Sequence, residues 1–431
     1  MASRRLALNL TQGLSKRAAF NAPVRRGFAT PVTTKNGVAT ECTTLSNGMT
    51  IATEHSPWAQ TSTVGVWIDA GSRAETDKTN GTAHFLEHLA FKGTSNRTQQ
   101  QLELEIENMG GHLNAYTSRE NTVYYAKAFN ADVPATVNIL SDILQNSKLE
   151  KSAIERERDV ILRESEEVDK QLEEVVFDHS IQREDLVDYI KTNYTADRMV
   201  LVGAGGVARA QLVELAEKHF AGLPSGPISQ ASAAVAQLQK RKPEFVGSEV
   251  RIRDDTIPTA NIAIAVEGVS WKDEDYFTAL VTQAIVGNWD KAMGNAPHMG
   301  SKLSGFVHKN DLANSFMSFS TSYSDTGLWG IYLVSDNLTR LDDLVHFTLR
   351  EWSRLSYNVT EAEDLGRQVV TSGRREGPDE VARVVSKITE KDIMDFAQRK
   401  LWDQDIAISA VGSIEGLLDY NRIRGDMSRN A

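Results

Sequence analysis

The side chains best suited to hold a metal ion in this chain are two histidines with a glutamate between them. His84, Glu87 and His88 form the pattern H-x-x-E-H. On an α-helix, residues four apart lie on one face about one turn apart, so the two imidazole rings can hold a single Zn²⁺. Glu87 borders the same face, where a carboxylate can activate a water molecule without being a ligand. The pattern predicts a zinc centre with a general base beside it.

The local sequence favours a helix around this pattern. Asn80-Gly81-Thr82 can cap its start, and Lys92-Gly93 can end it. Four apolar neighbours predict that the helix is largely buried: Phe85, Leu86, Leu89 and Phe91. The alternative is that the three polar residues fall on an amphipathic helix by chance. Buried histidines beside a carboxylate need partners, however, and a metal ion would supply one.

A catalytic zinc ion needs a third protein ligand and an open position for water. A charged helix predicted over residues 150–178 offers a choice of glutamates: Glu157, Glu164, Glu166, Glu167, Glu173 and Glu174. Glu164 shares a stripe with the apolar side chains Ile161 and Val168, and Glu157 is close to that stripe two turns earlier. A carboxylate on an apolar stripe is either paired or functional, whereas most glutamates on charged helices face water. The periodicity favours Glu164 and leaves the solvent-facing alternative open.

A sheet must position these helices, and short runs of β-branched and alternating residues predict its strands. They lie at residues 49–54, 63–70, 112–117, 122–127 and 198–203. The third and fourth runs flank a short polar turn and predict a hairpin. A further helix is predicted over residues 99–109, because Thr98 and Gln101 form a capping pair and two glycines follow.

The second part of the chain repeats this pattern in weaker form. Residues 259–268 and 401–412 match the strands near 61–71 and 194–205, while the helix over 279–289 contains no His or Glu. We therefore predict an α+β fold of two homologous α/β sandwich halves, each a mostly antiparallel sheet with helices packed on one side. Residues 38–222 would form the catalytic half, residues 223–243 a linker, and residues 244–431 a degenerate, non-catalytic half.

Charge is unevenly distributed along the chain. Residues 1–40 contain seven basic residues and no Asp or Glu, which leaves 40 basic and 58 acidic residues in the remainder. A basic, acid-free start with leucines on potential helical faces is typical of a mitochondrial transit peptide, which we assign to residues 1–28. A disordered arm that binds nucleic acid is the alternative. The acidic remainder would repel phosphate, so we expect no nucleic-acid partner.

Composition sets further bounds on the class of protein. The chain has 431 residues, of which 41% are hydrophobic and 24% charged, as expected for a globular protein of two or three domains. Its single cysteine, Cys42, excludes a disulfide framework and a zinc site built from cysteines. No uninterrupted apolar run is long enough to span a bilayer, so we expect no transmembrane segment.

These motifs resemble the pitrilysin/insulysin family of inverted zincins. The resemblance is carried by the sequences GTAHFLEHLAFKGT at 81–94, LNAYTSRE at 113–120 and ERDVILRESEEV at 157–168, and in the second half by residues 267–271 and 284–290. It covers nearly the whole chain after the leader. Within the family, the resemblance is strongest to subunits that process proteins imported into mitochondria. In some fungi such a subunit also serves in respiratory complex III.

The resemblance implies a complete zinc site. His84, His88 and Glu164 would bind one Zn²⁺ per chain, and Glu87 would be the general base. Glu157, near the same stripe of the helix, is expected to be a supporting carboxylate.

The resemblance also implies how a peptide substrate is bound. The substrate would add as a strand beside Asn114, Ala115 and Tyr116, which lets its sequence vary because backbone groups make the bonds. Glu174 and Asp178 would bind the arginine that precedes the cleaved bond, since two carboxylates suit one guanidinium, and Phe91 would contact the residue after it. The alternative for Glu174 and Asp178 is a solvated acidic pair on one helix face.

The expected function is that of a catalytic subunit in a heterodimeric zinc metalloendopeptidase. It would remove basic N-terminal presequences in the mitochondrial matrix, with a homologous non-catalytic α-subunit as its partner. The alternative is a structural core subunit of respiratory complex III on the matrix side of the inner membrane, in contact with other subunits of that complex. Both roles can coexist in one chain.

The chain departs from the family pattern at two positions. After Ser180 it lacks a segment that includes an L-G-R-T-I-L-G-P-like stretch, and after Glu363 it lacks most of a long helix. Neither departure removes an expected zinc ligand. The first adjoins Asp178, and the second removes the counterpart of the helix predicted over 150–178.

Overall fold

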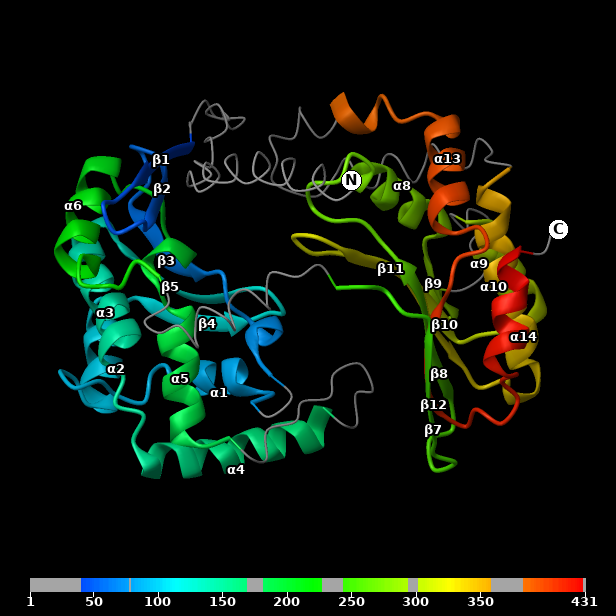
Figure 1. Cartoon of the computed structure of the whole chain (residues 1–431), viewed down its shortest axis with the longest axis horizontal. Helices are drawn as coiled ribbons and strands as arrows, with labels where there is room; N and C mark the ends of the chain where they lie inside the picture. Colours follow the sequence, from blue (N-terminus) through cyan, green and yellow to red (C-terminus); the bar gives the residue numbers. More distant parts are fainter. Residues whose placement is uncertain are drawn as a thin grey trace, which may run out of the picture.

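The computed structural model describes residues 40–76, 79–168, 181–226, 243–293, 301–357 and 383–428. Two six-stranded sheets organise this part of the chain, one in each half. Figure 1 shows the halves side by side, with several helices of the second half, among them α9, α10 and α14, on the outer side of its sheet. The α+β prediction of two sandwich halves is confirmed.

The first half places its strands in the order β1-β2-β6-β3-β5-β4. The pair β2 and β6 is parallel and every other neighbouring pair is antiparallel. Its strands are β1 (Thr40–Thr44), β2 (Thr50–His55), β3 (Thr61–Ile68), β4 (His112–Thr117), β5 (Thr122–Phe129) and β6 (Met199–Gly205). Its main helices are η1 (Ser72–Ala74), α1 (Thr82–Leu89), α2 (Gln99–Asn108), α3 (Val133–Asn146), α4 (Lys151–Val168), α5 (Arg183–Asn193) and α6 (Arg209–Phe220).

The second half has the strand order β7-β12-β8-β11-β10-β9. Its strands are β7 (Ser248–Arg253), β8 (Ala260–Glu267), β9 (Asn288–Asp290), β10 (Ser315–Ser322), β11 (Gly327–Ser335) and β12 (Ala407–Gly412). Its main helices are α8 (Tyr276–Val286), α9 (Lys302–Asn310), α10 (Leu341–Leu355), α13 (Glu390–Lys400) and α14 (Tyr420–Gly425).

The two sheets share five strands in the same arrangement. The order β2-β6-β3-β5-β4 in the first half corresponds to β7-β12-β8-β11-β10 in the second. In both, the first pair is parallel and the next three pairs are antiparallel. By this correspondence α8 takes the place of α1, and β10 takes the place of β4. The halves are therefore repeats of one fold, and the H-x-x-E-H pattern lies in the first.

Each half has its own apolar core, as expected for sheets that bury one face under helices. In the first half, Val137 and Leu140 of α3 are fully buried in the core that also contains Val64 and Val66 of β3. In the second, the rings of Trp329 and Trp352 pack edge to face with centroids 5.0 Å apart. Buried aromatic pairs of this kind contribute about 1 kcal/mol beyond the area they bury.

The two sheets differ at one edge. β4 pairs with β5 on one side and ends the first sheet. Its counterpart β10 pairs with β11 and also with β9, from Ser315↔Asp290 to Met317↔Asn288. The position beyond β4 that a further strand would occupy is thus filled in the second half, whereas the described residues place no strand there in the first. An open edge presents backbone groups that can pair with an extended peptide.

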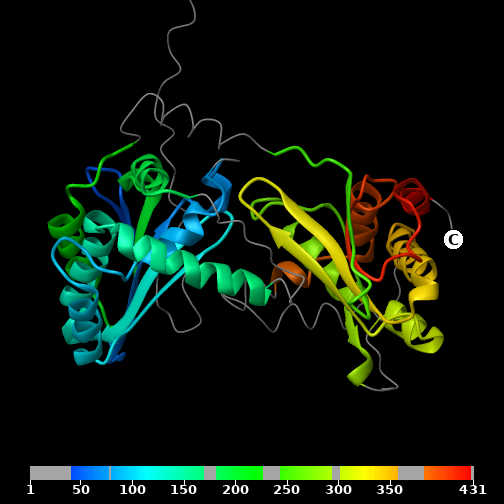
Figure 2. The same ribbon diagram turned by 90° about the horizontal axis from the view of Figure 1, so that it is seen from below.

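The β10–β11 hairpin connects the two halves in space. Figure 2 shows it reaching from the second half toward the segment that precedes α1.

Most predicted elements that fall within the described residues are confirmed. The predicted capping pair of Thr98 and Gln101 forms a reciprocal capping box at the start of α2. The long charged helix is described from Lys151 to Val168. The leader at residues 1–28, most of the linker and residues 169–178 lie outside the described part. None of the described helices combines the length and the apolar composition that crossing a bilayer requires.

Candidate metal centre

Helix α1 carries the H-x-x-E-H pattern, and its first turn is capped from outside the helix. Gly81 precedes it with φ at 94°, a left-handed conformation that glycine adopts without strain. The carboxylate oxygens of Glu75 accept hydrogen bonds from the backbone N–H groups of Gly81 and Ala83, each at 2.8 Å. These bonds satisfy donors that the helix leaves unpaired. The helix starts where the sequence predicts, but the capping oxygens belong to Glu75.

Two imidazole nitrogens and one carboxylate oxygen converge beside α1. Nε2 of His84 and Nε2 of His88 are 3.2 Å apart, and Nε2 of His88 is 3.1 Å from Oε2 of Glu164 on α4. The three ligand atoms all lie within 4.8 Å of one another. Ligand atoms about 2.1 Å from a tetrahedral Zn²⁺ are roughly 3.4 Å apart, so the donors and their spacing fit zinc. The packing of α4 on α1 brings the donors together.

Glu164 is more exposed than its stripe on α4 suggests. Ile161 is 2% exposed, whereas the side chain of Glu164 is 51% exposed. The apolar stripe therefore packs against the core up to Ile161, and the next turn reaches the margin of the site. Such a position suits a ligand of a catalytic ion, because water and substrate must reach the ion.

Glu87 lies on α1 next to His88 and outside the set of three converging donors. Its side chain is half-buried. Three protein ligands leave a fourth position around a tetrahedral ion for water. A carboxylate at the border of the ligand face is placed to accept a proton from such a water molecule.

Glu157 lies behind His88 and is almost fully buried. Its side chain is 10% exposed and pairs with the Lys92 ammonium at 2.8 Å. Its other oxygen is 3.7 Å from Nδ1 of His88, too long for a hydrogen bond but close enough to favour a proton on that nitrogen. A proton on Nδ1 leaves Nε2 free to bind metal, so the position agrees with a supporting role.

Two buried tyrosines near Glu87 were not predicted from the sequence. The hydroxyls of Tyr124 and Tyr194 share a hydrogen bond of 2.9 Å. Burial raises the pKa of Tyr194 to about 12, and the charge of Glu87 contributes further. Burial is also the main cause that raises the pKa of Tyr124 well above its ordinary value. Both hydroxyls are therefore neutral at physiological pH.

Two protein-family descriptions match this chain, one for each half. Residues 50–183 match the family described as Insulinase (Peptidase family M16), and residues 180–365 match the Peptidase M16 inactive domain. The first match contains all four residues of the proposed zinc and base set. This chain belongs to peptidase family M16. With its His-His-Glu donor set, it is a zinc metallopeptidase.

Several curated M16 proteins are similar to the chain over most of its length. It is 68% identical to the mitochondrial-processing peptidase subunit beta of Neurospora crassa, with 100% of both chains covered. It is 49% identical to the subunit of the same name from Saccharomyces cerevisiae, covering 87% of this chain and 91% of the relative. Identity to the subunit from Bos taurus is 45%, over 90% of this chain and 87% of the relative.

The alignment with the Neurospora subunit spans 481 positions, 50 more than the 431 residues of this chain. The relative therefore contains residues that have no counterpart here. This difference agrees with a chain that lacks segments of the family pattern, and the family matches end at residues 183 and 365, close to the two departures after Ser180 and Glu363.

One solved structure extends the comparison to the whole M16 fold. A chain of the structure titled Complex III2 from Candida albicans, Inz-5 bound, superposes with a TM-score of 0.75 at 27% sequence identity. The superposition covers 90% of this chain and 100% of that chain.

The residues expected to bind substrate in this M16 chain lie in different places. Asn114, Ala115 and Tyr116 are on β4, at the open edge of the first sheet, and β4 packs against α1. Phe91 follows α1 and is half-buried against the core. Glu174 and Asp178 lie outside the described residues. The structure thus brings the β4 residues next to the M16 metal helix.

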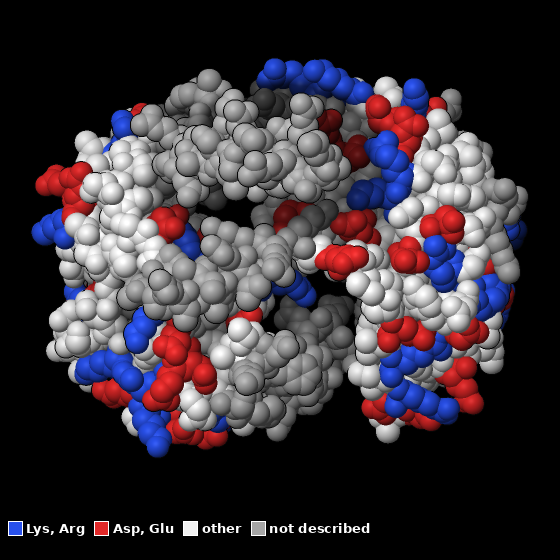
Figure 3. Space-filling model, viewed as in Figure 1, with Lys and Arg blue, Asp and Glu red and all other residues white. Residues whose placement is uncertain are grey.

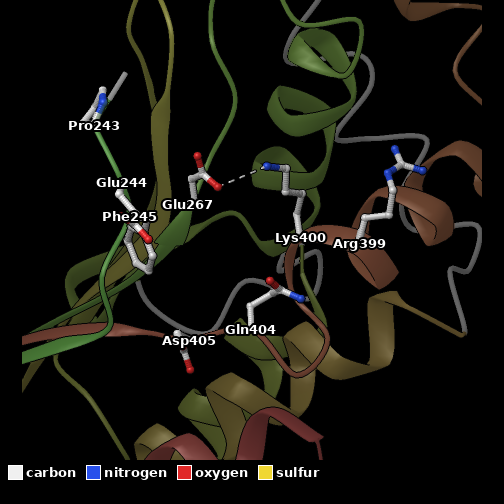
Figure 4. A pocket seen from close by; sticks show the side chains of 8 residues that line it. All are labelled: Pro243, Glu244, Phe245, Glu267, Arg399, Lys400, Gln404 and Asp405. Carbon is white, nitrogen blue, oxygen red and sulfur yellow. Dashed lines mark ion pairs between the residues drawn. The ribbon is translucent and has the colours of Figure 1, made fainter. Parts of the chain in front are cut away.

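Figure 3 shows a hollow between the halves, with both acidic and basic side chains at its margin. A separate cavity of about 490 Å³ lies in the second half, lined by residues that include Glu267, Arg399 and Lys400 (Figure 4). Its cations are paired, Lys400 with Glu267 at 3.8 Å and Arg399 with Asp275 at 2.6 Å. The converging metal donors belong to the first half and not to this cavity.

Proposed function

We propose that this chain is the catalytic subunit of a heterodimeric zinc metalloendopeptidase that removes basic N-terminal presequences from proteins imported into mitochondria. The observation that carries the proposal is the likeness of the whole chain to mitochondrial-processing peptidase β-subunits, combined with the converged set of His84, His88 and Glu164. A scaffold alone would not need two imidazoles and a carboxylate within metal-binding distance of one another.

The chemistry follows from the positions of these residues. Zn²⁺, when held by His84, His88 and Glu164, would polarise the scissile carbonyl and lower the pKa of a water molecule. Glu87 accepts a proton from the water that attacks the carbonyl carbon. The carbon–nitrogen bond then breaks, and Glu87 donates this proton to the leaving amine. Glu157, 3.7 Å from Nδ1 of His88, would help to orient this ring with Nε2 toward the site.

The open edge of β4 supports binding of the substrate as an added strand. In the second half the equivalent edge is occupied by β9, so the fold accommodates a strand at this place. Main-chain pairing holds an extended peptide with little regard to its sequence, as a processing enzyme with many substrates requires. Specificity for the arginine before the cleaved bond would come from Glu174 and Asp178, and Phe91 would contact the residue after it.

The name of the relatives as β-subunits supports a second, homologous subunit as the partner. We place the heterodimer in the mitochondrial matrix, with residues 1–28 as the cleaved leader. We propose residues 38–222 as the catalytic domain, 223–243 as the linker and 244–431 as the non-catalytic domain.

A second role is favoured by the likeness to a chain of complex III. In this role the protein is a core subunit on the matrix side of the inner membrane, in contact with other subunits of the complex. An intact donor set argues against a purely structural role, and both roles are compatible with one chain.

Incubation of the purified heterodimer with a basic presequence peptide tests the first function. We expect cleavage at one bond after an arginine, loss of cleavage with a chelator and recovery with Zn²⁺. Cleavage that persists in the chelator, with zinc shown to be absent, would reject the proposal. Native separation of mitochondrial complexes tests the second role: migration with complex III alone, and no soluble heterodimer, would favour the scaffold.

A further inference from the structure

The tip of the β10–β11 hairpin touches the first half beside the catalytic helix. Ser324 and Asp325 form this tip, and their partners are Arg73 in η1 and Glu120 in the turn between β4 and β5. We refer to these four residues as the hairpin contact. Figure 2 shows the hairpin crossing the space between the halves to reach this place.

A network of charge-assisted hydrogen bonds holds the hairpin contact. Arg73 donates to both carboxylate oxygens of Asp325, from Nη1 at 2.8 Å and from Nη2 at 2.5 Å. Nη1 also donates to Glu120 at 2.8 Å. Glu120 in turn accepts from the backbone N–H of Ser324 at 2.9 Å and from its hydroxyl at 2.7 Å. The network therefore joins the halves through both charged and backbone groups.

The geometry and burial of the network set it apart from ordinary surface ion pairs. The side chains of Arg73 and Asp325 are each 27% exposed, and that of Glu120 is 14% exposed. The hydrogen bonds to Asp325 are the main cause that raises the pKa of Arg73 above its ordinary value. A forked Arg–carboxylate pair with a third partner is stronger and more directional than an exposed pair.

The segment that carries Arg73 also supports the metal helix. The N–H of Arg73 donates to the carbonyl of Arg119 at 2.9 Å, which ties η1 to the β4–β5 turn. The two backbones are so close that a Cβ on Gly71 would lie 2.1 Å from the carbonyl oxygen of Ser118. Two residues after Arg73, Glu75 caps α1. A displacement of η1 would therefore move the cap of the helix that carries both histidines.

The same contact adjoins the proposed substrate strand. Glu120 lies three residues after Thr117, the last residue of β4. The Thr117 hydroxyl donates to the Ala83 carbonyl of α1 at 3.4 Å. The turn that Ser324 holds is thus continuous with β4, and β4 is bonded to the first turn of α1.

We propose that Asp325 is a positioning residue for the peptidase reaction. Through Arg73 and Glu120, the second half holds η1, the cap of α1 and the end of β4 in the arrangement that catalysis needs. The half that lacks the H-x-x-E-H pattern thus contributes to the reaction by positioning residues of the other half. Asp325 acts through Arg73 and not on the substrate. The proposal rests on the proposed peptidase function.

The test compares Asp325→Asn with a control variant in the assembled heterodimer. Asn keeps the size of the side chain and removes its charge. The control is Asp255→Asn, because Nε of Arg253 donates to both carboxylate oxygens of Asp255 at 2.9 and 3.0 Å, and this more exposed pair lies within the second half. For a presequence peptide we expect kcat/KM to fall on the order of 10-fold in Asp325→Asn, as is typical for residues of one coupled network, and to stay unchanged in the control.

Two further measurements separate positioning from a simple tether. Hydrogen exchange should become faster in peptides covering residues 71–90 of Asp325→Asn, while zinc content stays at one per chain. Asp325→Glu, which keeps the negative charge beside Arg73, should retain more activity than Asp325→Asn. Unchanged kcat/KM in Asp325→Asn, unchanged exchange in 71–90, or an equal loss of activity in Asp325→Glu and Asp325→Asn would overturn the proposal. If the unaltered heterodimer fails to cleave the peptide, the proposed function fails, and exchange in 71–90 still tests the contact.

Discussion

Glu157 and Glu164 lie two turns apart on α4, and their surroundings give them different tasks. Glu164 is half-exposed and 3.1 Å from a histidine nitrogen that can bind metal. Glu157 is buried, paired with Lys92 and next to the opposite nitrogen of the same ring. The first position suits a ligand at an open site. The second suits a group that fixes the ring of His88.

Glu157→Gln is therefore expected to weaken zinc binding without abolishing it. The neutral amide no longer favours the proton on Nδ1 of His88, and it leaves the Lys92 ammonium without its partner. We expect zinc affinity to fall about 10-fold to 100-fold, as for other groups that orient metal ligands. Competition with a zinc chelator of known affinity measures it. Glu155→Gln is the control, because the Glu155 side chain is 57% exposed on the same helix. Equal affinities in all three proteins would contradict the assignment.

The buried tyrosine pair predicts how stability depends on pH. The pKa of Tyr194 is about 12 in the folded chain against an ordinary value of 10.0. The folded state thus holds the phenol proton more tightly, so this contribution to stability is complete below pH 10 and is lost as pH rises through about 12. The advantage of the unaltered chain over Tyr194→Phe should shrink across this window, by about 3 kcal/mol at most.

Urea unfolding at a series of pH values up to 12 tests this expectation. Tyr125→Phe is a suitable control, because Tyr125 is partly exposed on the same strand as Tyr124. A free-energy difference between the unaltered chain and Tyr194→Phe that stays constant over the window would contradict it.

Site residues whose partners lie nearby in the sequence could be predicted from it, whereas residues whose partners lie far away in the sequence could not. His84, Glu87 and His88 share one helix, so the helical period alone puts them on neighbouring faces. Glu164 required a guess about which helix packs on α1. The hairpin contact joins residues 252 positions apart, from Arg73 to Asp325. No local period or capping rule relates such residues, and only the folded chain brings them together.

Among the secondary-structure elements, strand order determines whether the edge of each sheet can pair with a further strand. The five shared strands put β4 and β10 at equivalent places. β9 covers β10, and β4 has an open side among the described residues. Sequence predicted the β4–β5 hairpin because its strands are local. It did not predict β9, because a strand from Asn288 to Asp290 is too short to show a period.

If the substrate pairs with β4 through its backbone, the N–H groups of every second substrate residue should contribute to binding. Successive amides of an extended peptide point to opposite sides, so only every second N–H can pair with β4. Methylation of one backbone nitrogen at a time should weaken binding strongly at alternate residues. Each lost hydrogen bond should raise KM roughly 5-fold, from about 1 kcal/mol. A series of N-methylated peptides measures this. Equal effects at neighbouring positions, or none at any, would contradict strand addition.

At the scale of the whole molecule, charge separates the leader from the rest. Once residues 1–40 are set aside, acidic residues outnumber basic ones by 58 to 40. A body of this charge attracts basic peptides over distances beyond direct contact. The two departures from the family pattern, after Ser180 and after Glu363, concern the build of the halves. They leave the metal donor set intact.

Binding of a basic presequence should therefore depend on salt. Raising ionic strength from about 0.05 M to about 0.5 M shortens the range of electrostatic attraction from over 10 Å to a few Å. We expect KM for a basic peptide to rise several-fold while kcat changes little. A peptide with the same cleavage site but fewer basic residues serves as the control and should respond less. An identical response of both peptides would contradict electrostatic attraction.

Glu87 is the proposed base of the zinc peptidase site in the first half. Glu87→Gln tests this role, because the amide keeps the shape of the side chain and cannot accept the proton. In the heterodimer with its zinc retained, we expect a loss of kcat on the order of 100-fold or more for a presequence peptide, with KM little changed. Full retention of activity, with zinc measured at one per chain, would contradict it.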